Sequence, residues 1–118
     1  MKILIVDDNK EITEMLHDYL ELADFDVHVI NDGLSALEEI KKDEFDKILL
    51  DLSMPEFSGF DILEGLKEKD FKYFNKIIIL TASELDLDKT NKLKRLGIKY
   101  IFLKPLGVSK IIEAFESN

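Results

Sequence analysis

The chain begins with the sequence MKILIVDD (residues 1–8), a short apolar run that ends at two aspartates. An unbroken series of Ile, Leu and Val, without polar alternation, is typical of a strand covered on both faces, as in a parallel sheet. Four more runs of this kind follow, at residues 27–30, 48–50, 77–80 and 101–103. The pattern predicts five buried strands.

Between these runs, apolar residues recur at helical spacing. The strongest pattern spans residues 12–20, and weaker ones span 34–40, 63–66, 86–96 and 108–115. In the first helix we expect one buried stripe, formed by Ile12, Met15, Leu16, Tyr19 and Leu20. Gly33 and Gly59 mark helix starts and Gly97 a helix end, whereas Gly65 interrupts a helical pattern. Alternating strands and helices with right-handed crossovers predict an α/β fold, a doubly wound (βα)₅ sandwich.

Length and composition predict a single domain over residues 1–118. A chain of this length that is 46% hydrophobic can bury about two-thirds of its surface. The lack of cysteine excludes disulfides, thiol catalysis and cysteine–zinc sites. No apolar run approaches the roughly 20 residues that span a bilayer, and the N-terminus turns acidic too early for a secretion signal. We therefore expect a cytoplasmic protein with no membrane partner.

The net charge of −9 is unevenly distributed. Residues 1–59 carry 5 basic and 16 acidic side chains, whereas residues 60–118 carry 11 and 9. This balance argues against direct nucleic-acid binding, which requires a cationic face. Residues 89–104, however, contain six Lys or Arg residues and no acid. This segment is either a solvated helix face or a surface for an acidic partner, the acidic half of a second copy included.

Polar residues with complementary chemistry follow four of the predicted strands. Asp7 and Asp8 end the first, Asp51 the third, Thr81 the fourth and Lys104 the fifth. Ligands of doubly wound sheets collect at these carboxyl ends. Three neighbouring carboxylates need more counter-charge than one lysine supplies, and oxygen-only ligands favour Mg²⁺, or Mn²⁺, over zinc. A cation, a lysine and a hydroxyl around a carboxylate predict a site that handles phosphoryl groups.

The chain resembles the receiver domain of two-component response regulators over nearly its full length. The matching stretches are IVDDN (5–9), DLSMPE (51–56) with Ser58-Gly59, LTA (80–82) and LKP (103–105). The resemblance implies a flavodoxin-like parallel sheet of strand order 2-1-3-4-5. It also implies a signalling module of a phosphorelay rather than an enzyme, one that catalyses its own phosphorylation and dephosphorylation.

The resemblance assigns roles to the acidic residues. Asp51 resembles the phospho-acceptor, whose carboxylate attacks a phosphohistidine and becomes an aspartyl phosphate. Asp8 resembles a direct Mg²⁺ ligand, and Asp7 resembles one that acts largely through water. Asp51 is expected to be a further ligand, and Ser53 is expected to supply a main-chain carbonyl.

The remaining site residues are implied in the same way. Lys104 resembles the lysine that pairs with Asp51 and then with its phosphoryl group, and the bond before Pro105 is expected to be cis. Thr81 resembles the hydroxyl that moves to bind the phosphoryl oxygen. Ser83, two residues later, is expected beside the path of an attacking water.

One position departs from the pattern of the family. Three residues before the lysine, where receivers usually carry an aromatic switch residue, this chain has Ile101. Tyr100 and Phe102 are expected on the opposite face of the strand, because side chains alternate along a strand. Either an isoleucine packs in the space of the aromatic, or the chain signals by a different displacement.

The resemblance implies two kinds of protein partner. One is a sensor histidine kinase or phosphotransfer protein, and the other is a downstream target. The target, or a second copy in a phosphorylation-dependent homodimer, is expected on the face formed by residues 86–96, 101–103 and 108–115. The controlled output is expected on another chain or beyond this sequence, because 118 residues accommodate a receiver and little else.

Three other functions compete with this interpretation. A receiver-like scaffold regulated by protein binding should lack part of the site, yet all five residues are present. A Mg²⁺-dependent phosphatase of the haloacid dehalogenase type needs a second aspartate two residues after the first, where this chain has Ser53. A flavodoxin-like electron carrier would place a flavin phosphate after the first strand, where Asp7 and Asp8 would repel it.

Overall fold

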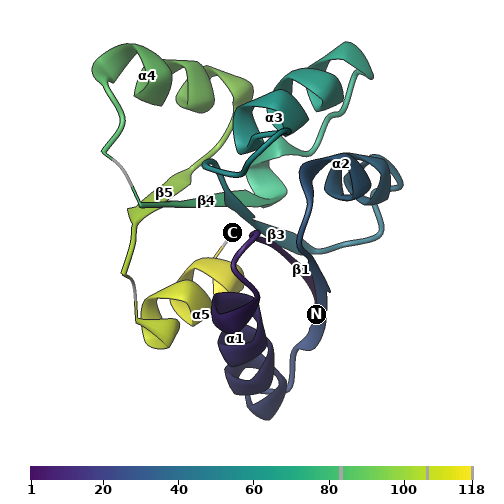
Figure 1. Ribbon diagram of the computed structural model, residues 1–118, viewed down its shortest axis with the longest axis vertical. Coiled ribbons are helices and arrows are strands. Elements are labelled where there is room, and N and C mark those ends of the chain that lie inside the picture. The colour runs from purple at the N-terminus through teal and green to yellow at the C-terminus, as the bar shows by residue number, and fades with distance from the viewer. Residues whose placement is uncertain (83, 106, 118) are drawn as a thin grey trace.

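Five strands and five helices alternate along the chain in the computed structural model, which describes residues 1–82, 84–105 and 107–117 (Figure 1). The strands are β1 (Lys2–Val6), β2 (Asp26–Ile30), β3 (Lys47–Asp51), β4 (Ile77–Thr81) and β5 (Tyr100–Leu103). The helices are α1 (Lys10–Leu22), α2 (Gly33–Lys41), α3 (Gly59–Glu68), α4 (Leu87–Leu96) and α5 (Val108–Glu116), with a 3₁₀ turn η1 (Phe74–Lys76) before β4. Within these residues, no helix is long and apolar enough to cross a membrane.

The strands form one parallel sheet in the order β2-β1-β3-β4-β5, which confirms the predicted order. In the register, Ile5 lies opposite Leu49, and Thr81 lies opposite Leu103. Strand β2 lies on one side of β1, and β3, β4 and β5 follow on its other side. The ends of β1 and β3 are therefore neighbours at the point where the strand order reverses. Doubly wound sheets bind their ligands at this point.

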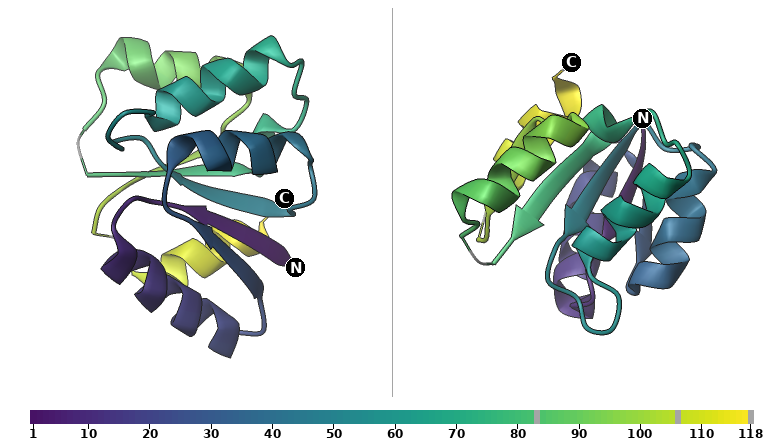
Figure 2. Two further views of the ribbon diagram at one scale, coloured as in Figure 1. Left: turned by 45° about the vertical axis from the view of Figure 1, so that its right-hand side comes forward. Right: turned by 90° about the horizontal axis from the view of Figure 1, so that it is seen from above.

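Helices cover both faces of the sheet, as continuous apolar strands require. Helices α1 and α5 lie on one face, and α2, α3 and α4 lie on the other (Figures 1 and 2). Each layer has its own cluster of buried side chains: Leu20 and Phe115 belong to the first, and Ile40, Ile62 and Leu93 belong to the second.

The glycines lie at the helix boundaries that the sequence predicts. Gly33 and Gly59 begin α2 and α3, and Gly97 follows α4 with φ at 105°. The left-handed region is accessible to glycine at little cost. Gly65, at which the sequence pattern predicts an interruption, lies inside a continuous α3, and the side chain of Leu37 on α2 packs against it.

The expected apolar stripe of α1 is partly wrong. Met15 and Tyr19 are 47% and 55% exposed, whereas Leu16 and Leu20 are buried as expected. The third buried position of the helix is Thr13, a polar residue. A threonine can be buried here because its hydroxyl has hydrogen-bond partners. The buried face of α1 is thus rotated about the helix axis relative to the face that the apolar pattern predicts.

Candidate functional site

Asp7 and Asp8 occupy the short connection between β1 and α1. Asp7 is buried, at 3% exposure, and Asp8 is exposed. The main-chain N–H of Asn9 donates to Oδ1 of Asp7 over 3.0 Å. The side chain of Asn9 also caps α1 by accepting from the N–H groups of Glu11 and Ile12. One asparagine therefore orients the buried carboxylate and fixes the start of the helix.

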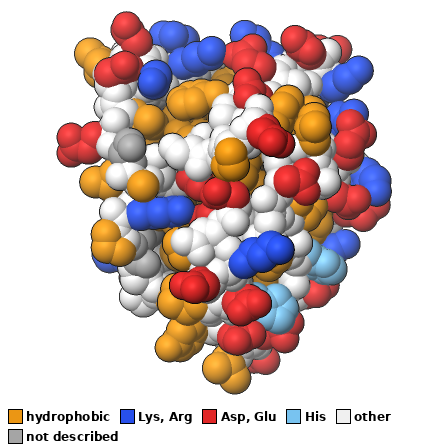
Figure 3. All heavy atoms as spheres, viewed as in Figure 1, with side chains coloured by type: hydrophobic (Ala, Val, Ile, Leu, Met, Phe, Trp, Pro, Cys, Tyr) orange, Lys and Arg blue, Asp and Glu red, His pale blue; other side chains and the backbone are white. Residues whose placement is uncertain are grey.

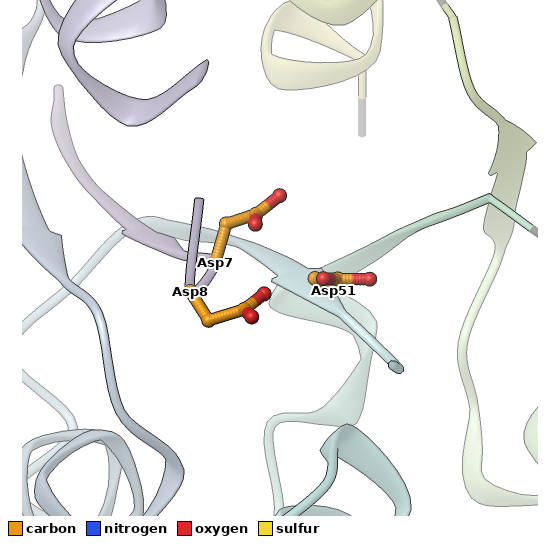
Figure 4. Close-up of side chains that lie close together, drawn as sticks. All are labelled: Asp7, Asp8 and Asp51. Carbon is orange, nitrogen blue, oxygen red and sulfur yellow. The ribbon is translucent and has the colours of Figure 1, made fainter. Parts of the chain in front are cut away.

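Asp51 ends β3, the strand beside β1, and is 4% exposed. The N–H of Ser53 donates to Oδ1 of Asp51 over 3.1 Å. Carboxylate oxygens of Asp7, Asp8 and Asp51 lie within 4.8 Å of one another. Figure 4 shows the three side chains on the same side of the ends of β1 and β3. A cluster of oxygen ligands at this spacing fits a hard divalent cation.

Lys104 lies against this cluster, directly after β5. Its Nζ is 2.6 Å from Oδ2 of Asp7 and 3.7 Å from Oδ2 of Asp51. The main-chain N–H of Lys104 donates to the carbonyl of Thr81, the buried last residue of β4, over 2.7 Å. The peptide bond between Lys104 and Pro105 is cis, as expected. The predicted pairing with Asp51 is present, but the shorter contact is with Asp7.

The electrostatics of the cluster are unbalanced. Burial raises the pKa of the Asp51 carboxyl, and the charges of Asp7 and Asp8 raise this pKa further. The Ser53 N–H and the Lys104 ammonium act in the opposite direction. In the part of the chain that the structure describes, Lys104 supplies the one ammonium paired with this cluster, so that two negative charges stay uncompensated when all three carboxylates are ionised. The residues present therefore fit a divalent cation in both ligand type and charge.

Two residues that support the site are missing from the sequence prediction. The side-chain amide of Asn31, directly after β2, donates to the carbonyl of Asp7 over 2.8 Å and to Oγ1 of Thr13 over 3.1 Å. The Thr13 hydroxyl in turn donates to the carbonyl of Lys10. These bonds tie the loop that carries Asp7 to both β2 and α1. In the sequence, this supporting role is indicated only by the position of Asn31 at the end of β2, the strand that neighbours β1.

Ile101 faces the layer of α2, α3 and α4, whereas Tyr100 and Phe102 face the layer of α1 and α5. The predicted alternation along β5 is confirmed. The rings of Tyr100 and Phe102 stack at 5.8 Å on that other face. No aromatic side chain of β5 therefore points toward the α4 side at this position. Ser83 lies outside the described residues.

Comparison with known proteins gives a family. A family model for the response regulator receiver domain matches residues 3–116. The regulatory protein VanRc of Enterococcus gallinarum is 33% identical over 111 residues, which are 94% of this chain and 46% of that protein. The transcriptional regulatory protein CpxR of Escherichia coli K12 is 36% identical with the same coverage. The chain thus spans about half the length of these relatives.

Solved structures agree with the family model. The chemotaxis protein CheY4 of Vibrio cholerae has a TM-score of 0.81 and 28% identity, and the alignment covers 98% of this chain and 95% of that one. A Francisella response regulator receiver domain has a TM-score of 0.82 and 27% identity, with 97% and 92% covered. The acidic cluster lies at the strand ends of a fold that these proteins share. The chain belongs to the response regulator receiver domain family of two-component systems.

Proposed function

We propose that the chain is a phospho-accepting switch, in which Asp51 takes a phosphoryl group from a phosphohistidine on a sensor histidine kinase or phosphotransfer protein. One observation carries this proposal. Three carboxylates have oxygens within 4.8 Å of one another, and among the described residues only Lys104 forms ion pairs with them, through Asp7 and Asp51. Such a site binds a cation and stabilises negative charge on a phosphoryl group.

The transfer replaces one bond to phosphorus by another. A carboxylate oxygen of Asp51 bonds to phosphorus as the phosphorus–nitrogen bond breaks, and the imidazole leaves with the electron pair. Asp7, Asp8, Asp51 and the Ser53 carbonyl would hold Mg²⁺. When bound, the ion neutralises charge on the phosphoryl oxygens. The Lys104 ammonium, 3.7 Å from Asp51, would pair with a phosphoryl oxygen at that carboxylate.

The surface beside Lys104 suits the phosphoryl donor. A small hollow of about 170 Å³ is lined by Met15, Lys104, Pro105 and apolar residues of α1 and α5. Met15 and Tyr19, which α1 leaves exposed, extend this apolar surface along the helix. Exposed apolar side chains next to a reactive group indicate a protein contact. We propose that the kinase or phosphotransfer protein docks on α1, with its histidine directed at Asp51.

The output is proposed to pass through the face of α4, β5 and α5. Thr81 would connect this face to the site, because its carbonyl accepts from the N–H of Lys104 and the residue lines a hollow of about 640 Å³ together with residues of α4 and β5. Phosphorylation would change partner binding there, either of a target protein or of a second copy in a homodimer. Such a switch shifts the balance between two existing packings of the surface.

The test is labelling by a small phosphodonor. Wild-type protein is incubated with acetyl phosphate and Mg²⁺, and phosphorylation is followed by intact mass and by mobility on a phosphate-affinity gel. We expect one acid-stable, hydroxylamine-sensitive label that requires Mg²⁺ and is absent in Asp51→Asn and Asp51→Ala. Asp70→Asn, at an exposed aspartate far along the chain from the site, is the matched control and retains the label.

The same incubation separates the competing functions. A phosphatase would release phosphate continuously without a stable label, whereas a switch accumulates one label per chain. A scaffold would show neither label nor Mg²⁺-dependent response to beryllofluoride, which mimics the phosphoryl group. Absence of labelling in the wild type, or undiminished labelling in Asp51→Asn, contradicts the proposal.

A further inference from the structure

Strand β2 forms one edge of the sheet, and its outer side is unpaired. Within the described residues it pairs only with β1. The N–H of Asp26 points toward β1, where it donates to the carbonyl of Met1 over 3.0 Å. Because backbone groups alternate in direction along a strand, the N–H and C=O groups of Val27 and Val29 point away from β1. These groups form a free edge to which a further strand can hydrogen-bond.

A hollow lies on each side of this free edge. The hollow on the α2 side has a volume of about 550 Å³, and the hollow on the α1 side has a volume of about 480 Å³. Val29 lines both of them. Side chains alternate between the two faces of a sheet, so a strand added to β2 would direct its side chains alternately to the two hollows. We call the free side of β2 and these hollows the β2 edge surface.

Acidic residues dominate the lining of the two hollows. The lining contains four carboxylates and one lysine, namely Glu14, Asp18, Glu38, Glu39 and Lys10. Both histidines of the chain, His17 and His28, also lie there, each beside a carboxylate. Figure 3 shows the histidines with acidic side chains around them, on the side of the molecule where α1 and α2 lie. The surface therefore favours a positively charged ligand.

The ion pairs already present leave most of this charge available. Glu38 and Glu39 pair with Lys41 and Lys42 at the end of α2, over 3.0 and 2.9 Å. Exposed pairs of this kind contribute little to stability, so a cation of a partner can replace them. Among the described residues Glu14 forms no ion pair.

The α2 hollow also has an apolar floor. It is formed by Leu4, which is fully buried, together with Ile30 and Phe45. Lysine and arginine pack their long stems on apolar surface while their charged ends stay in water or at a carboxylate. An apolar floor beside two glutamates therefore suits these side chains better than it suits a small cation.

We propose that the β2 edge surface binds an extended segment of another protein, rich in lysine or arginine, which adds to the sheet beside β2. Its main chain bonds to Val27 and Val29, and its basic side chains reach the carboxylates of the two hollows. In complexes of this kind the main-chain hydrogen bonds supply affinity, and the pockets for alternate side chains supply specificity.

A basic segment suits the surface better than a second copy of the chain. Each copy carries a net charge of −9, so two copies repel each other as they approach. Pairing of β2 with β2 would also bring Glu14, Asp26 and Glu38 of both copies to one edge. Exposed charges on an edge strand, such as Asp26, discourage pairing of this kind between identical sheets.

The β2 edge surface is separate from the surfaces proposed for the kinase and for the output. Lys10 and Glu14 line the α1 hollow, whereas Met15 and Tyr19 lie on the opposite side of α1, because the helix repeats every 3.6 residues. Strand β5 is at the other edge of the sheet. A segment bound at β2 leaves both of those surfaces open, and its docking does not rest on phosphorylation of Asp51.

The experiment begins with selection of short random peptides, displayed on phage, against the whole chain at low ionic strength. We expect enrichment of sequences in which Lys and Arg are interspersed with β-branched or aromatic residues, without proline in the bound segment. The affinity of a synthetic consensus peptide is then measured by fluorescence anisotropy. Higher salt should weaken the complex.

Charge reversals test the two hollows. Glu14→Lys and Glu38→Lys should each weaken peptide binding about tenfold, whereas Lys10→Glu should strengthen it. Glu113→Lys, a matched reversal at an exposed residue of α5, should retain binding within about twofold. Asp51→Asn should also bind like the wild type, which separates docking from the proposed switch. Circular dichroism confirms that each variant is folded.

Strand addition is tested through the main chain. N-methyl groups at alternate residues remove the donors on one edge of the peptide, in two versions. The version that blocks the edge facing β2 should lose about tenfold in affinity, and the other should stay within about twofold of the unmodified peptide. Bound peptide should slow amide hydrogen exchange of Val27 and Val29 about tenfold, as followed by NMR, and leave that of His28, whose N–H points toward β1, unchanged.

Several outcomes overturn the inference. They are no enrichment, enrichment of neutral or acidic peptides, equal losses in Glu38→Lys and Glu113→Lys, or equal affinity of the two N-methylated versions. Peptide binding without slower exchange at Val27 and Val29 would place the peptide elsewhere on the chain. A concentration-dependent dimer that protects these two amides would make a second copy, and not a basic segment, the occupant.

Discussion

Two glycines of α3 have opposite expected responses to the same substitution, Gly→Ala. At Gly59 an added Cβ would lie 2.5 Å from the carbonyl oxygen of Asp51 and 2.7 Å from Cα of Leu52. At Gly65 it would lie 2.8 Å from Cδ2 of Leu37, the end of a side chain on α2. Backbone atoms of a buried strand end cannot move aside, whereas a half-buried leucine can rotate.

The magnitudes follow from these contacts. Forcing a methyl group into a packed site typically costs about 1–3 kcal/mol, and we expect Gly59→Ala to fall in that range. Alanine inside a helix gains about 1 kcal/mol over glycine, so Gly65→Ala should be neutral or stabilising after Leu37 moves. For a chain of this length, about 1 kcal/mol corresponds to roughly 4 °C in Tm.

The assay is thermal and urea unfolding of both variants, together with their Mg²⁺-dependent response to beryllofluoride. Because the clash at Gly59 involves the carbonyl of Asp51, Gly59→Ala should lose part of this response as well as stability. Gly65→Ala should keep it. The reasoning is refuted if Gly59→Ala unfolds like the wild type, or if Gly65→Ala is the less stable of the two.

Three further predictions concern the site and its loops. Because burial raises the pKa of Asp51, the ionised carboxylate lowers the stability of the folded chain at neutral pH. Without divalent cation, Asp51→Asn should therefore have a higher Tm than the wild type at pH 7, and this difference in Tm should shrink as falling pH protonates the wild-type carboxyl. Thr13→Val removes the hydroxyl that accepts from Asn31, so it should lower the free energy of unfolding in urea by about 1 kcal/mol and weaken Mg²⁺ binding, whereas Thr13→Ser should keep the stability and the Mg²⁺ affinity of the wild type. Equal Mg²⁺ affinity in the two variants would contradict a role of Thr13 in supporting the site. Glu56 has φ at 66°, a conformation that costs a side chain about 1 kcal/mol, so Glu56→Gly should raise Tm, and an unchanged or lower Tm would show that the loop carries no such strain.

Much of the fold follows from the sequence because each strand is encoded locally. An apolar run followed by Asp, Thr or Lys marks both a buried parallel strand and its carboxyl end, as at Asp51 and Lys104. Parallel strands bring these ends to one edge of the sheet without further information. For that reason the sequence alone places Asp7, Asp8 and Asp51 together, and the structure confirms their proximity.

The orientation of α1 could not be predicted in this way. Helical periodicity ranks residues by their hydrophobicity, so it places Met15 and Tyr19 in the core and Thr13 outside. In the structure Thr13 is buried because the amide of Asn31 reaches its hydroxyl. A hydrogen bond between residues 18 positions apart is a property of the folded chain, and no local pattern indicates it.

The position of Lys104 shows how the proposed switch can operate. Its ammonium pairs with Asp7 at 2.6 Å while remaining within 3.7 Å of Asp51, so it already compensates part of the cluster charge. A divalent cation would compensate the two remaining negative charges of the carboxylates, and the attraction between Asp7 and the lysine would weaken. A phosphoryl group on Asp51 would then be the strongest anion within reach of Nζ. Because the main-chain N–H of Lys104 donates to the carbonyl of Thr81, which lines a hollow beside α4 and β5, a shift of the Lys104 side chain toward Asp51 would connect the charge of the acidic site to the face of α4, β5 and α5.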